Sequence, residues 1–416
     1  MKGNRIRFPF LFVILLVFID EMKELLQPEI QAFINQNINV DIQKLSLYKN
    51  PFPEIDYKII LNQIEAKTKA KSKLTTWFTT ENIIFPNKIS VEQTSSEAAA
   101  KYKSELISGK NIIDLTGGFG VDCFYFSKVF ENVIHCEINP ELSQTVKHNF
   151  KVLKADNITC YAKDGLEVLK ELNQKLDWIY IDPSRRNDSK GKVFLLKDCL
   201  PDVTTLLEEY LQYSDKILIK TSPIYDISVG ISELKFIKNI HIVSIDNEVK
   251  EVLFEIQKQI KSENISINTI NITPTKIEEF EFSLNDEVLA TYSEPQKYLY
   301  EPNASVMKSQ GFGPISKQFR INKLHQHSHL YTSNQLIDFV GRTFEIKQVI
   351  PYKKSVMKAL LQGKKANITT RNFPETVAQI RQKWKISDGG NFYCFFTTNL
   401  KNEKIVVLCD KITSLN

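Results

Sequence analysis

The sequence predicts an α/β protein with a doubly wound sheet of seven strands, a helical N-terminal region and small α+β domains toward its C-terminal end. From residue 111 onward, short apolar runs rich in β-branched residues alternate with stretches of helical pattern. This alternation is typical of a sheet whose strands are joined by crossover helices. The chain of 416 residues also exceeds the size at which one hydrophobic core remains efficient, so several domains are expected.

The N-terminal region, residues 1–100, is expected to be mainly helical. Prolines in "KNPFPEIDY" and "IIFPNKIS" are expected to end helices and turn the chain. Thr94, followed three residues later by Glu97, fits a capping box. This pattern predicts a helix that runs toward Gly109.

An apolar segment, residues 8–19, follows Arg5 and Arg7 in an order typical of a signal peptide. No small-residue cleavage site follows it, and the segment is too short to span a bilayer comfortably. We therefore expect a cytoplasmic protein without a membrane partner, in which residues 1–21 belong to an over-extended start and Met22 is the alternative to Met1. A membrane-tethered enzyme is the other interpretation.

Seven runs in the central part of the chain have the length and composition of strands. In a doubly wound sheet, ligands bind at the carboxyl ends of the strands. Functional residues are therefore expected directly after these runs. The runs are residues 111–115, 132–138, 157–162, 176–181, 215–220, 240–245 and 251–256.

Two smaller domains are predicted after residue 260. Residues 261–310 begin with a stretch rich in Ile and Thr that alternates as a small sheet does, which predicts a small β-rich unit. Residues 311–416 form strand, helix and strand patterns and hold 17 Lys and Arg against 6 Asp and Glu. Because concentrated positive charge attracts polyanions, we expect this module to bind nucleic acid; a solvated lysine face is the other interpretation.

Three glycines follow the first predicted strand and precede a predicted helix: Gly117, Gly118 and Gly120. Because no side chain covers this turn, a ligand is expected to lie across its backbone at the helix N-terminus. Gly118 and Gly120 are expected to clear the turn of side chains, and Gly117 to supply a positive φ angle.

Charge decides which ligand the turn favours. Asp114 ends the strand before the turn and Asp122 opens the helix after it, so a pyrophosphate would meet two carboxylates. S-adenosylmethionine carries no phosphate and presents an ammonium and a sulfonium group. The pattern D-x-x-x-G-x-G from Asp114 to Gly120, with Thr116 inside the turn, therefore favours S-adenosylmethionine as the cofactor.

The next two strands end in acids that fit the same cofactor. Glu137, 23 residues after Asp114, can accept hydrogen bonds from both ribose hydroxyls, and the adjacent Ile138 is assigned to the same site. Asp164 is placed to meet the adenine amino group. A helix N-cap is the alternative interpretation of Asp164.

These motifs resemble those of class I S-adenosylmethionine-dependent methyltransferases, which have a Rossmann-like sheet, over about residues 93–256. Five segments are similar to bacterial methyltransferases with a ferredoxin-like insert and a C-terminal THUMP-like domain: "EQTSSEAAAKYK", "DLTGGFGVD", "IYIDPSRR", "KTSPIYDI" and "NEVKEVLFE". The segments "HLYTS" and "ANITTRNFP" extend the resemblance. It implies RNA as the substrate, with residues 101–260 as the methyltransferase domain, 261–310 as the ferredoxin-like unit and 311–416 as the THUMP-like domain.

The stretch "DWIYIDPSRRN" ends the fourth predicted strand at the position where class I methyltransferases that act on nucleic acid place their target base. Asp182 can accept a hydrogen bond from an exocyclic amine, and Pro183 stiffens the turn. Arg185 and Arg186 can clamp a phosphate. The alternative is a surface turn whose arginines pair with Asp188.

The sequence favours a nitrogen or oxygen acceptor. The segment D-P-S-R lacks the aromatic residue of the N/D-P-P-aromatic tetrad that amine-methylating enzymes usually show. It is nearer to the D-P-P-R pattern of 5-methyluridine enzymes. Those enzymes need a cysteine nucleophile after the fifth strand, however, and no cysteine stands there in this sequence. Lys220, Ser222 and Tyr225 are expected to line the pocket instead. A small-molecule or protein methyltransferase, and a catalytically silent RNA-binding protein that keeps the fold, are the rival interpretations.

No metal site is expected. His325, His327 and His329 alternate and would share one face of a strand, but no carboxylate or cysteine lies near them in the sequence. We interpret them as polar linker residues, one of which contacts phosphate. The six cysteines form no C-x-x-C pair, which fits reduced thiols.

Overall fold

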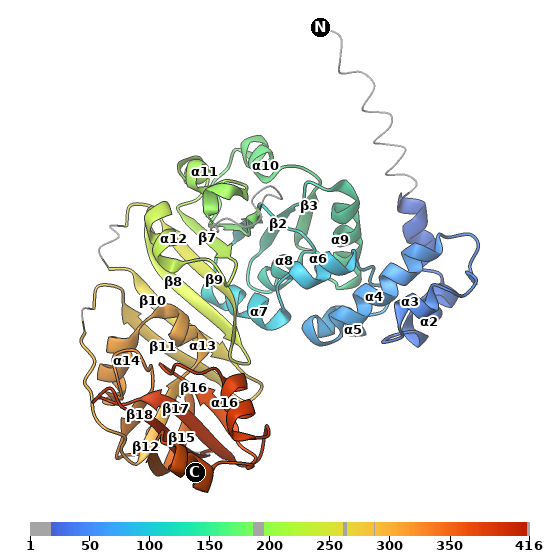
Figure 1. The fold of residues 1–416 in the computed structure, drawn as a ribbon. Helices are drawn as coiled ribbons and strands as arrows, with labels where there is room; N and C mark the ends of the chain where they lie inside the picture. Colours follow the sequence, from blue (N-terminus) through green and yellow to red (C-terminus); the bar gives the residue numbers. More distant parts are fainter. Residues whose placement is uncertain (1–17, 186–194, 261–263, 287, 414–416) are drawn as a thin grey trace. The chain divides into compact units, whose positions relative to one another are not determined.

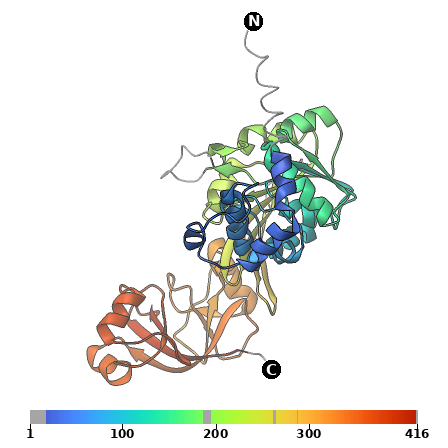
Figure 2. The ribbon, with the colours of Figure 1, turned by 90° about the vertical axis from the view of Figure 1, so that its right-hand side faces the viewer.

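The computed structural model describes residues 18–185, 195–260, 264–286 and 288–413 (Figure 1). The chain divides into two compact units. The first unit comprises residues 1–236 with 255–260, and the second comprises residues 237–254 with 261–416. Figure 2 shows the same ribbon from a second side. Within the described residues, no helix is both long enough and apolar enough to cross a membrane.

The first unit begins with the predicted helical region. Residues 18–25 are helical, and five helices follow before residue 94. Apolar side chains from these helices, among them Leu25, Ile30 and Ile60, form their own buried cluster. The helices are α2 (Pro28–Gln36), α3 (Ile42–Leu45), α4 (Tyr57–Lys73), α5 (Thr75–Thr79) and α6 (Lys88–Gln93).

Helix α7 (Glu97–Leu106) begins later than the sequence predicts. Its N-cap is Ser96, whose hydroxyl accepts the backbone N–H of Ala99, whereas Thr94 caps the C-terminus of α6. The predicted capping box is therefore wrong, because Thr94 ends the preceding helix. Glu97 instead accepts hydrogen bonds from the backbone and hydroxyl of Thr76 at 2.6 and 2.7 Å.

Five parallel strands of the first unit stand in the order β7-β4-β1-β2-β3. Because crossovers between parallel strands are right-handed, α8 and α9 lie on one face of this sheet and α10 and α11 on the other. The strands are β1 (Asn111–Asp114), β2 (Asn132–Cys136), β3 (Ile158–Tyr161), β4 (Trp178–Ile181) and β7 (Lys216–Thr221). The helices are α8 (Val121–Phe126), α9 (Pro140–Val152), α10 (Gly165–Leu172), α11 (Val203–Tyr210) and α12 (Ile227–Glu233).

All seven predicted runs are strands, but the count of seven for the sheet is wrong. The sheet has nine strands in the order β11-β10-β8-β9-β7-β4-β1-β2-β3. The two additional strands are β10 (Ser266–Ile272), which runs parallel to β8 (Ile237–Ile245), and β11 (Ile277–Ser283), which is antiparallel to β10. Alternating apolar residues indicate a strand but do not indicate which sheet it joins. Strand β9 (Glu248–Gln257) lies between β8 and β7.

The second unit also holds a seven-stranded sheet in the order β13-β14-β12-β15-β18-β17-β16. Strands β15 (Gly341–Pro351) and β18 (Lys404–Lys411) form its antiparallel centre. Helices α15 (Lys354–Leu360) and α16 (Val377–Trp384) contribute Met357, Ile380 and Trp384 to a core cluster with β17 and β18. The other elements are β12 (Tyr298–Pro302), α13 (Ala304–Ser309), α14 (Phe312–Phe319), β13 (Asn322–Lys323), β14 (Tyr331–Ser333), β16 (Asn367–Thr370) and β17 (Phe392–Thr398).

Candidate functional site

The loop between β1 and α8 holds three glycines whose roles differ. Gly118 and Gly120 have φ angles of 51° and 77°, which favour glycine. The φ angle of Gly117 lies outside this positive range, so the predicted role of Gly117 is wrong. A Cβ atom at Gly117 would lie 2.3 Å from the His135 ring, and one at Gly120 would lie 2.5 Å from the ring of Phe150. Close packing of these rings therefore requires both glycines.

His135, which the sequence analysis did not single out, supports this loop from β2. Its ring is fully buried, and Nε2 lies 3.2 Å from the carbonyl oxygen of Gly118. Burial lowers the pKa of His135 to about 4, so the ring is neutral at pH 7. Because a carbonyl oxygen only accepts, the proton of this hydrogen bond is on Nε2. A single histidine in a strand pattern carries no sequence signal for such a role.

Asp114 points into the loop. Its side chain is buried, with 2% of the residue exposed. Oδ1 accepts hydrogen bonds from the backbone N–H of Thr116 at 2.9 Å and from its hydroxyl at 3.2 Å, and Oδ2 accepts from the Cys123 thiol at 3.4 Å. Burial raises the pKa of Asp114 to about 7, and the nearby carboxylates Asp122 and Asp182 contribute to this rise.

Thr116 connects the ends of β1 and β4. Its hydroxyl donates to Asp114 and accepts the backbone N–H of Asp182 at 2.7 Å. The two acids that the sequence places after different strands are thus joined through one threonine. This contact fixes the backbone at Asp182 relative to the glycine loop.

A buried ion pair connects α7 to α8, the helix that follows the glycine loop. Lys103 is fully buried, and its Nζ lies 3.1 Å from Oδ1 of Asp122. Oδ2 of Asp122 accepts hydrogen bonds from the hydroxyls of Ser95 and Tyr180, each at 2.9 Å. Burial alone raises the pKa of Asp122, but Lys103 and then Lys220 outweigh it, so the pKa lies below its ordinary value.

Lys220 and Asp182 form a second ion pair between the ends of β7 and β4. Lys220 is buried, whereas the side chain of Asp182 keeps 34% of its surface exposed. Because Lys220 also lowers the pKa of Asp122, the two ion pairs belong to one charged cluster. We call this cluster of Lys103, Asp122, Lys220 and Asp182 the buried charge network.

The remaining residues predicted at this edge have different surroundings. Pro183 is buried and Ser222 is half-buried. Tyr225 is fully buried and donates its hydroxyl to Glu233 at 2.7 Å, so the prediction that Tyr225 lines the pocket is wrong. Arg185 belongs to β5 (Ser184–Arg185), which pairs with β6 (Cys199–Leu200). The predicted phosphate clamp at Arg186, and its alternative partner Asp188, lie outside the described residues.

Two further predicted positions follow β2. Glu137 accepts the backbone N–H of Gly118 through Oε2 at 3.1 Å and that of Asn139 through Oε1 at 2.7 Å. Burial raises the pKa of Glu137. The neighbouring Ile138 is apolar, yet 74% of it is exposed. Glu137 is thus hydrogen-bonded to the glycine loop, and Ile138 follows it in the chain.

Asp164 follows β3 and is exposed. Its Oδ1 accepts the backbone N–H groups of Leu166 and Glu167 at 2.9 and 3.2 Å. Asp164 is therefore the N-cap of α10, which is the alternative interpretation that the sequence left open.

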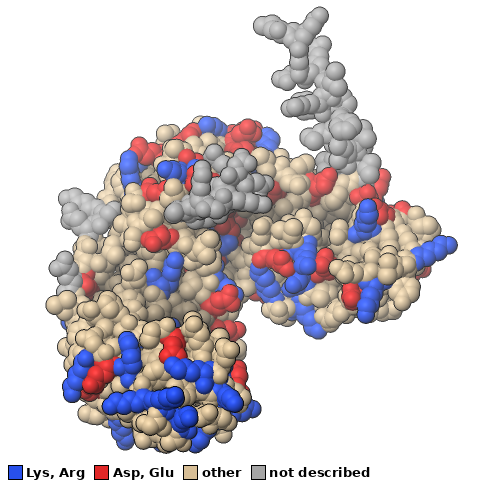
Figure 3. Space-filling model, viewed as in Figure 1, with Lys and Arg blue, Asp and Glu red and all other residues tan. Residues whose placement is uncertain are grey.

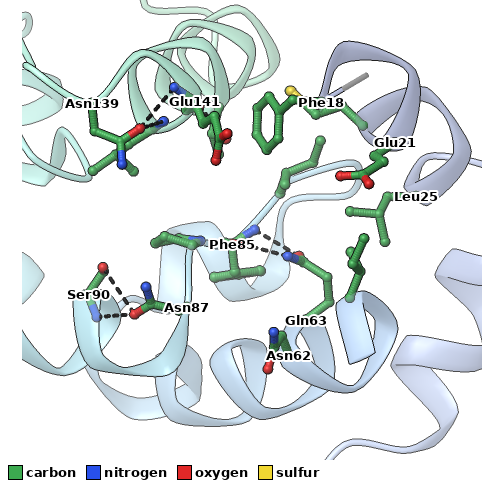
Figure 4. A pocket seen from close by; sticks show the side chains of 16 residues that line it. Phe18, Glu21, Leu25, Asn62, Gln63, Phe85, Asn87, Ser90, Asn139 and Glu141 are labelled. Carbon is green, nitrogen blue, oxygen red and sulfur yellow. Dashed lines mark hydrogen bonds between the residues drawn. The ribbon is translucent and has the colours of Figure 1, made fainter. Parts of the chain in front are cut away.

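A pocket of about 300 Å³ opens between the N-terminal helices and the first turn of α9 (Figure 4). Its lining combines apolar side chains such as Phe18 and Leu25 with the carboxylates of Glu21 and Glu141. Burial and then the negative charge of Glu141 raise the pKa of Glu21. The pocket includes Asn139, whose backbone N–H binds Glu137, so it borders the glycine-loop region.

The three alternating histidines lie in a turn of the second unit rather than in a linker or along one strand. His325 is buried and lies 3.0 Å from the Asn402 and Asn372 side chains, while the His329 ring stacks on Phe312 with 3.9 Å between centroids. The interpretation as polar linker residues is wrong, because packing around the turn buries His325. Among the described residues, no group of three His, Cys, Asp or Glu side chains has a metal-binding arrangement.

Comparison with known proteins assigns the class. A family model for RNA cap guanine-N2 methyltransferase matches residues 109–219. A ferredoxin-like domain model matches residues 298–339, and a THUMP domain-like model matches residues 341–411. The sheet with its glycine loop is therefore that of a methyltransferase.

Two relatives add detail. One is the crystal structure of a "putative methyltransferase" from Porphyromonas gingivalis W83. Its sequence is 30% identical to the present chain, the TM-score is 0.82, and the match covers 94% of the present chain and 98% of the other. An uncharacterized RNA methyltransferase of Clostridium acetobutylicum is 30% identical over 134 residues, and this match spans 30% of the present chain and only 28% of that protein. The present chain belongs to the family of methyltransferases with a ferredoxin-like domain and a C-terminal THUMP-like domain, which confirms the resemblance found in the sequence.

Proposed function

We propose that this protein transfers a methyl group from S-adenosylmethionine to a nitrogen or oxygen atom of a base in structured RNA. The observation that carries the cofactor half is the surface formed by Gly118, Glu137 and Ile138. A Cβ atom at Gly118 would meet only the Thr116 carbonyl oxygen, at 3.8 Å, so the space beside this backbone is open. Ile138, whose apolar surface is exposed, directly follows Glu137 in the chain, and Glu137 accepts the backbone N–H of Gly118.

An adenosine fits the chemistry of this surface. The adenine ring would cover Ile138 and remove its apolar surface from water. Each oxygen of Glu137 accepts one backbone N–H and retains a further lone pair, so both can accept ribose hydroxyls. Asp164, whose Oδ1 caps α10, can still accept the adenine amino group through Oδ2.

The charges favour a cationic ligand over a phosphate. Asp114, Asp122, Asp182 and Glu137 surround the loop, and the two nearby lysines are already paired with Asp122 and Asp182. Burial has raised the pKa of Asp114 to about 7, so a cation bound nearby would favour its ionised form and an anion would oppose it. We infer that Asp114 responds to the cofactor through charge and holds the loop through Thr116.

The acceptor base would lie beside Asp182. When bound, S-adenosylmethionine would supply a methyl group on a positively charged sulfur. The ion pair with Lys220 orients Asp182, whose carboxylate can accept a hydrogen bond from an exocyclic amine. Pro183 stiffens the turn, Ser222 lines the same edge, and Arg185 lies in the adjoining β5. Alignment of the acceptor is the main catalytic requirement for such a displacement.

RNA as the substrate class is supported by the charge of residues 311–416, where Lys and Arg exceed Asp and Glu by 17 to 6. The THUMP domain-like match covers residues 341–411 of this region. A partial relative that is named as an RNA methyltransferase adds weight to the same class.

Two measurements test the proposal. Calorimetry with S-adenosylmethionine is expected to show binding that Glu137→Ala weakens strongly, while Asp182→Ala keeps binding and lowers turnover. Mass spectrometry of nucleosides in total RNA, from cells with and without the protein, is expected to reveal one modified nucleoside that depends on it. Binding without any change in RNA would favour a small-molecule or protein substrate, and no binding would favour a silent RNA-binding protein.

A further inference from the structure

Two loops of the second unit meet beside the C-terminal ends of α15 and α16. The backbone N–H of Gly363 donates to the carbonyl of Trp384 at 3.1 Å, and that of Ser387 donates to Lys364 at 3.0 Å. The N–H of Ala366 donates in return to Ser387 at 3.1 Å. Segments separated by about twenty residues in the sequence are therefore held together as one edge.

Four exposed lysines lie on this edge: Lys358 in the last turn of α15, Lys364 and Lys365 in the first loop, and Lys385 at the end of α16. We call these four residues the lysine edge. Lys353 and Lys354 are also exposed and lie at the opposite end of α15. In Figure 3, Lys and Arg side chains gather over the C-terminal part of the chain.

The charge of the lysine edge is not compensated locally. Residues 353–388 contain nine Lys and Arg but only two acids, Glu375 and Asp388. Both acids are already paired, Glu375 with Lys383 at 3.0 Å and Asp388 with Arg381. Within the part of the chain that the structure describes, none of the four lysines of the edge has an acidic partner.

Folding stability alone does not select a lysine at position 385. Lys385 has a φ angle of 53°, in the left-handed region where glycine or asparagine commonly ends a helix. A bound anion would offset this cost.

The aromatic side chains of this region are engaged in contacts with one another. The indole N–H of Trp384 donates to the hydroxyl of Tyr352 at 3.0 Å, and that hydroxyl donates to Glu375 at 2.8 Å. Trp384 is buried. The buried Trp384 ring therefore does not serve as a platform on which bases stack.

We propose that the lysine edge binds the phosphodiester backbone of RNA and does so without reading its bases. Lysine ammonium groups act as point charges toward phosphates, and such contacts position a nucleic acid without selecting its sequence. This inference rests on the proposed function and deepens it, since it names the residues that hold the substrate of that methyltransferase.

The test compares two full-length variants that lose the same charge. The edge variant carries Lys358→Gln, Lys364→Gln, Lys365→Gln and Lys385→Gln. The control variant carries glutamine at four exposed lysines elsewhere in the second unit: Lys317, Lys347, Lys401 and Lys411. Binding of a labelled RNA hairpin of about 20 base pairs is measured by fluorescence anisotropy between about 50 and 200 mM salt. Thermal unfolding checks that both variants fold.

We expect the edge variant to bind about tenfold or more weakly, and its plot of log Kd against log salt to flatten by about 0.7 to 0.9 for each phosphate that the protein no longer neutralises. The control variant is expected to bind nearly as tightly as the unmodified protein. Equal weakening in both variants would show general attraction and overturn the proposal, as would wild-type binding by the edge variant.

Methyl transfer separates this inference from the proposed function. If the unmodified protein methylates RNA and the edge variant binds the hairpin normally, the inference alone fails. If the unmodified protein neither binds nor methylates RNA, both fail. If the edge variant loses binding to vesicles rich in phosphatidylserine while its RNA binding is unchanged, the edge is assigned to a membrane surface, which also contradicts the proposal.

Discussion

Replacement of Lys103 by methionine isolates the energy of the buried charge network. Methionine keeps the length and apolar stem of lysine but removes the ammonium group that lies 3.1 Å from Oδ1 of Asp122. Lys103 is fully buried and Asp122 is 9% exposed, so the remaining carboxylate cannot recover its hydration. Removal of one partner from such a pair typically costs about 3 to 5 kcal/mol. Because Lys220, Tyr180 and Ser95 still stabilise Asp122, we expect about 3 kcal/mol.

The pH dependence gives this prediction its sign. In the unmodified protein the pKa of Asp122 lies below its ordinary value of 3.8, so ionised Asp122 stabilises the fold above that value and this contribution is lost as the pH falls below it. Without Lys103 we expect burial, the largest influence on Asp122, to outweigh the remaining contacts and to raise the pKa of Asp122 above 3.8. Ionisation then opposes folding, so the loss of stability in Lys103→Met is expected to be largest near pH 8 and to shrink toward pH 5.

Urea unfolding of the first unit, followed by tryptophan fluorescence at several pH values, measures the effect. Lys101→Met on the same helix is the matched control, because Lys101 forms an exposed pair with Glu105 at 3.7 Å and is expected to change stability little. Adding Asp122→Asn to Lys103→Met is expected to recover most of the loss. A loss that is independent of pH, or that Asp122→Asn does not relieve, would refute the argument from an unpaired buried charge.

Three further outcomes are expected. Gly117→Ala places a Cβ atom 2.3 Å from the His135 ring, so it is expected to lower the free energy of unfolding by about 1 to 3 kcal/mol in a melting experiment. Gly118→Ala is expected to lower it less, because space is open there and only the φ angle of 51° opposes the substitution. Cofactor affinity measured by calorimetry is expected to fall by up to about tenfold per pH unit below pH 7. The reason is that Asp114, with its pKa of about 7, must lose a proton to face a cation. Asp114→Asn is expected to abolish this pH dependence. Lys385→Gly removes a lysine from the left-handed region, so it is expected to raise the free energy of unfolding by about 0.5 to 1 kcal/mol and to weaken RNA binding. The role of that residue would be contradicted if the variant were no more stable and its RNA binding depended on salt as steeply as that of the unmodified protein.

The sequence predicts the strands well because each is a local run of apolar residues, but it predicts their assembly less well. Strands β10 and β11 have the pattern of a small separate sheet, and only the pairing of β10 with β8, and of β11 with β10, shows that they extend the main one. The position of the glycine loop is local information, whereas the reason for Gly117 lies in a ring from another strand. Tertiary partners that are distant in the sequence therefore decide what the pattern leaves open.

The same distinction applies to the charged residues. Asp114 and Asp182 follow strands and are found from that position, but their connection through Thr116 depends on two strand ends meeting. Lys103 was missed although a signal exists: it falls three and four residues after the buried Ala100 and Ala99, on the apolar face of α7. A lone charge on such a face indicates a buried partner.

The two charged features of the chain differ in the way that their charges are balanced, and this difference makes them separable in experiment. In the buried charge network each lysine has a carboxylate partner within the fold, and salt screens such buried pairs poorly. On the lysine edge the charges are exposed and have no acidic partner among the described residues, so on binding RNA they would release the cations that are condensed along its phosphates. Added salt is therefore expected to weaken RNA binding steeply while cofactor binding changes little. A cofactor affinity that declined with salt as steeply as RNA affinity would mean that the ligand of the glycine loop is itself a polyanion, and the assignment of that loop to a methyl donor would fail.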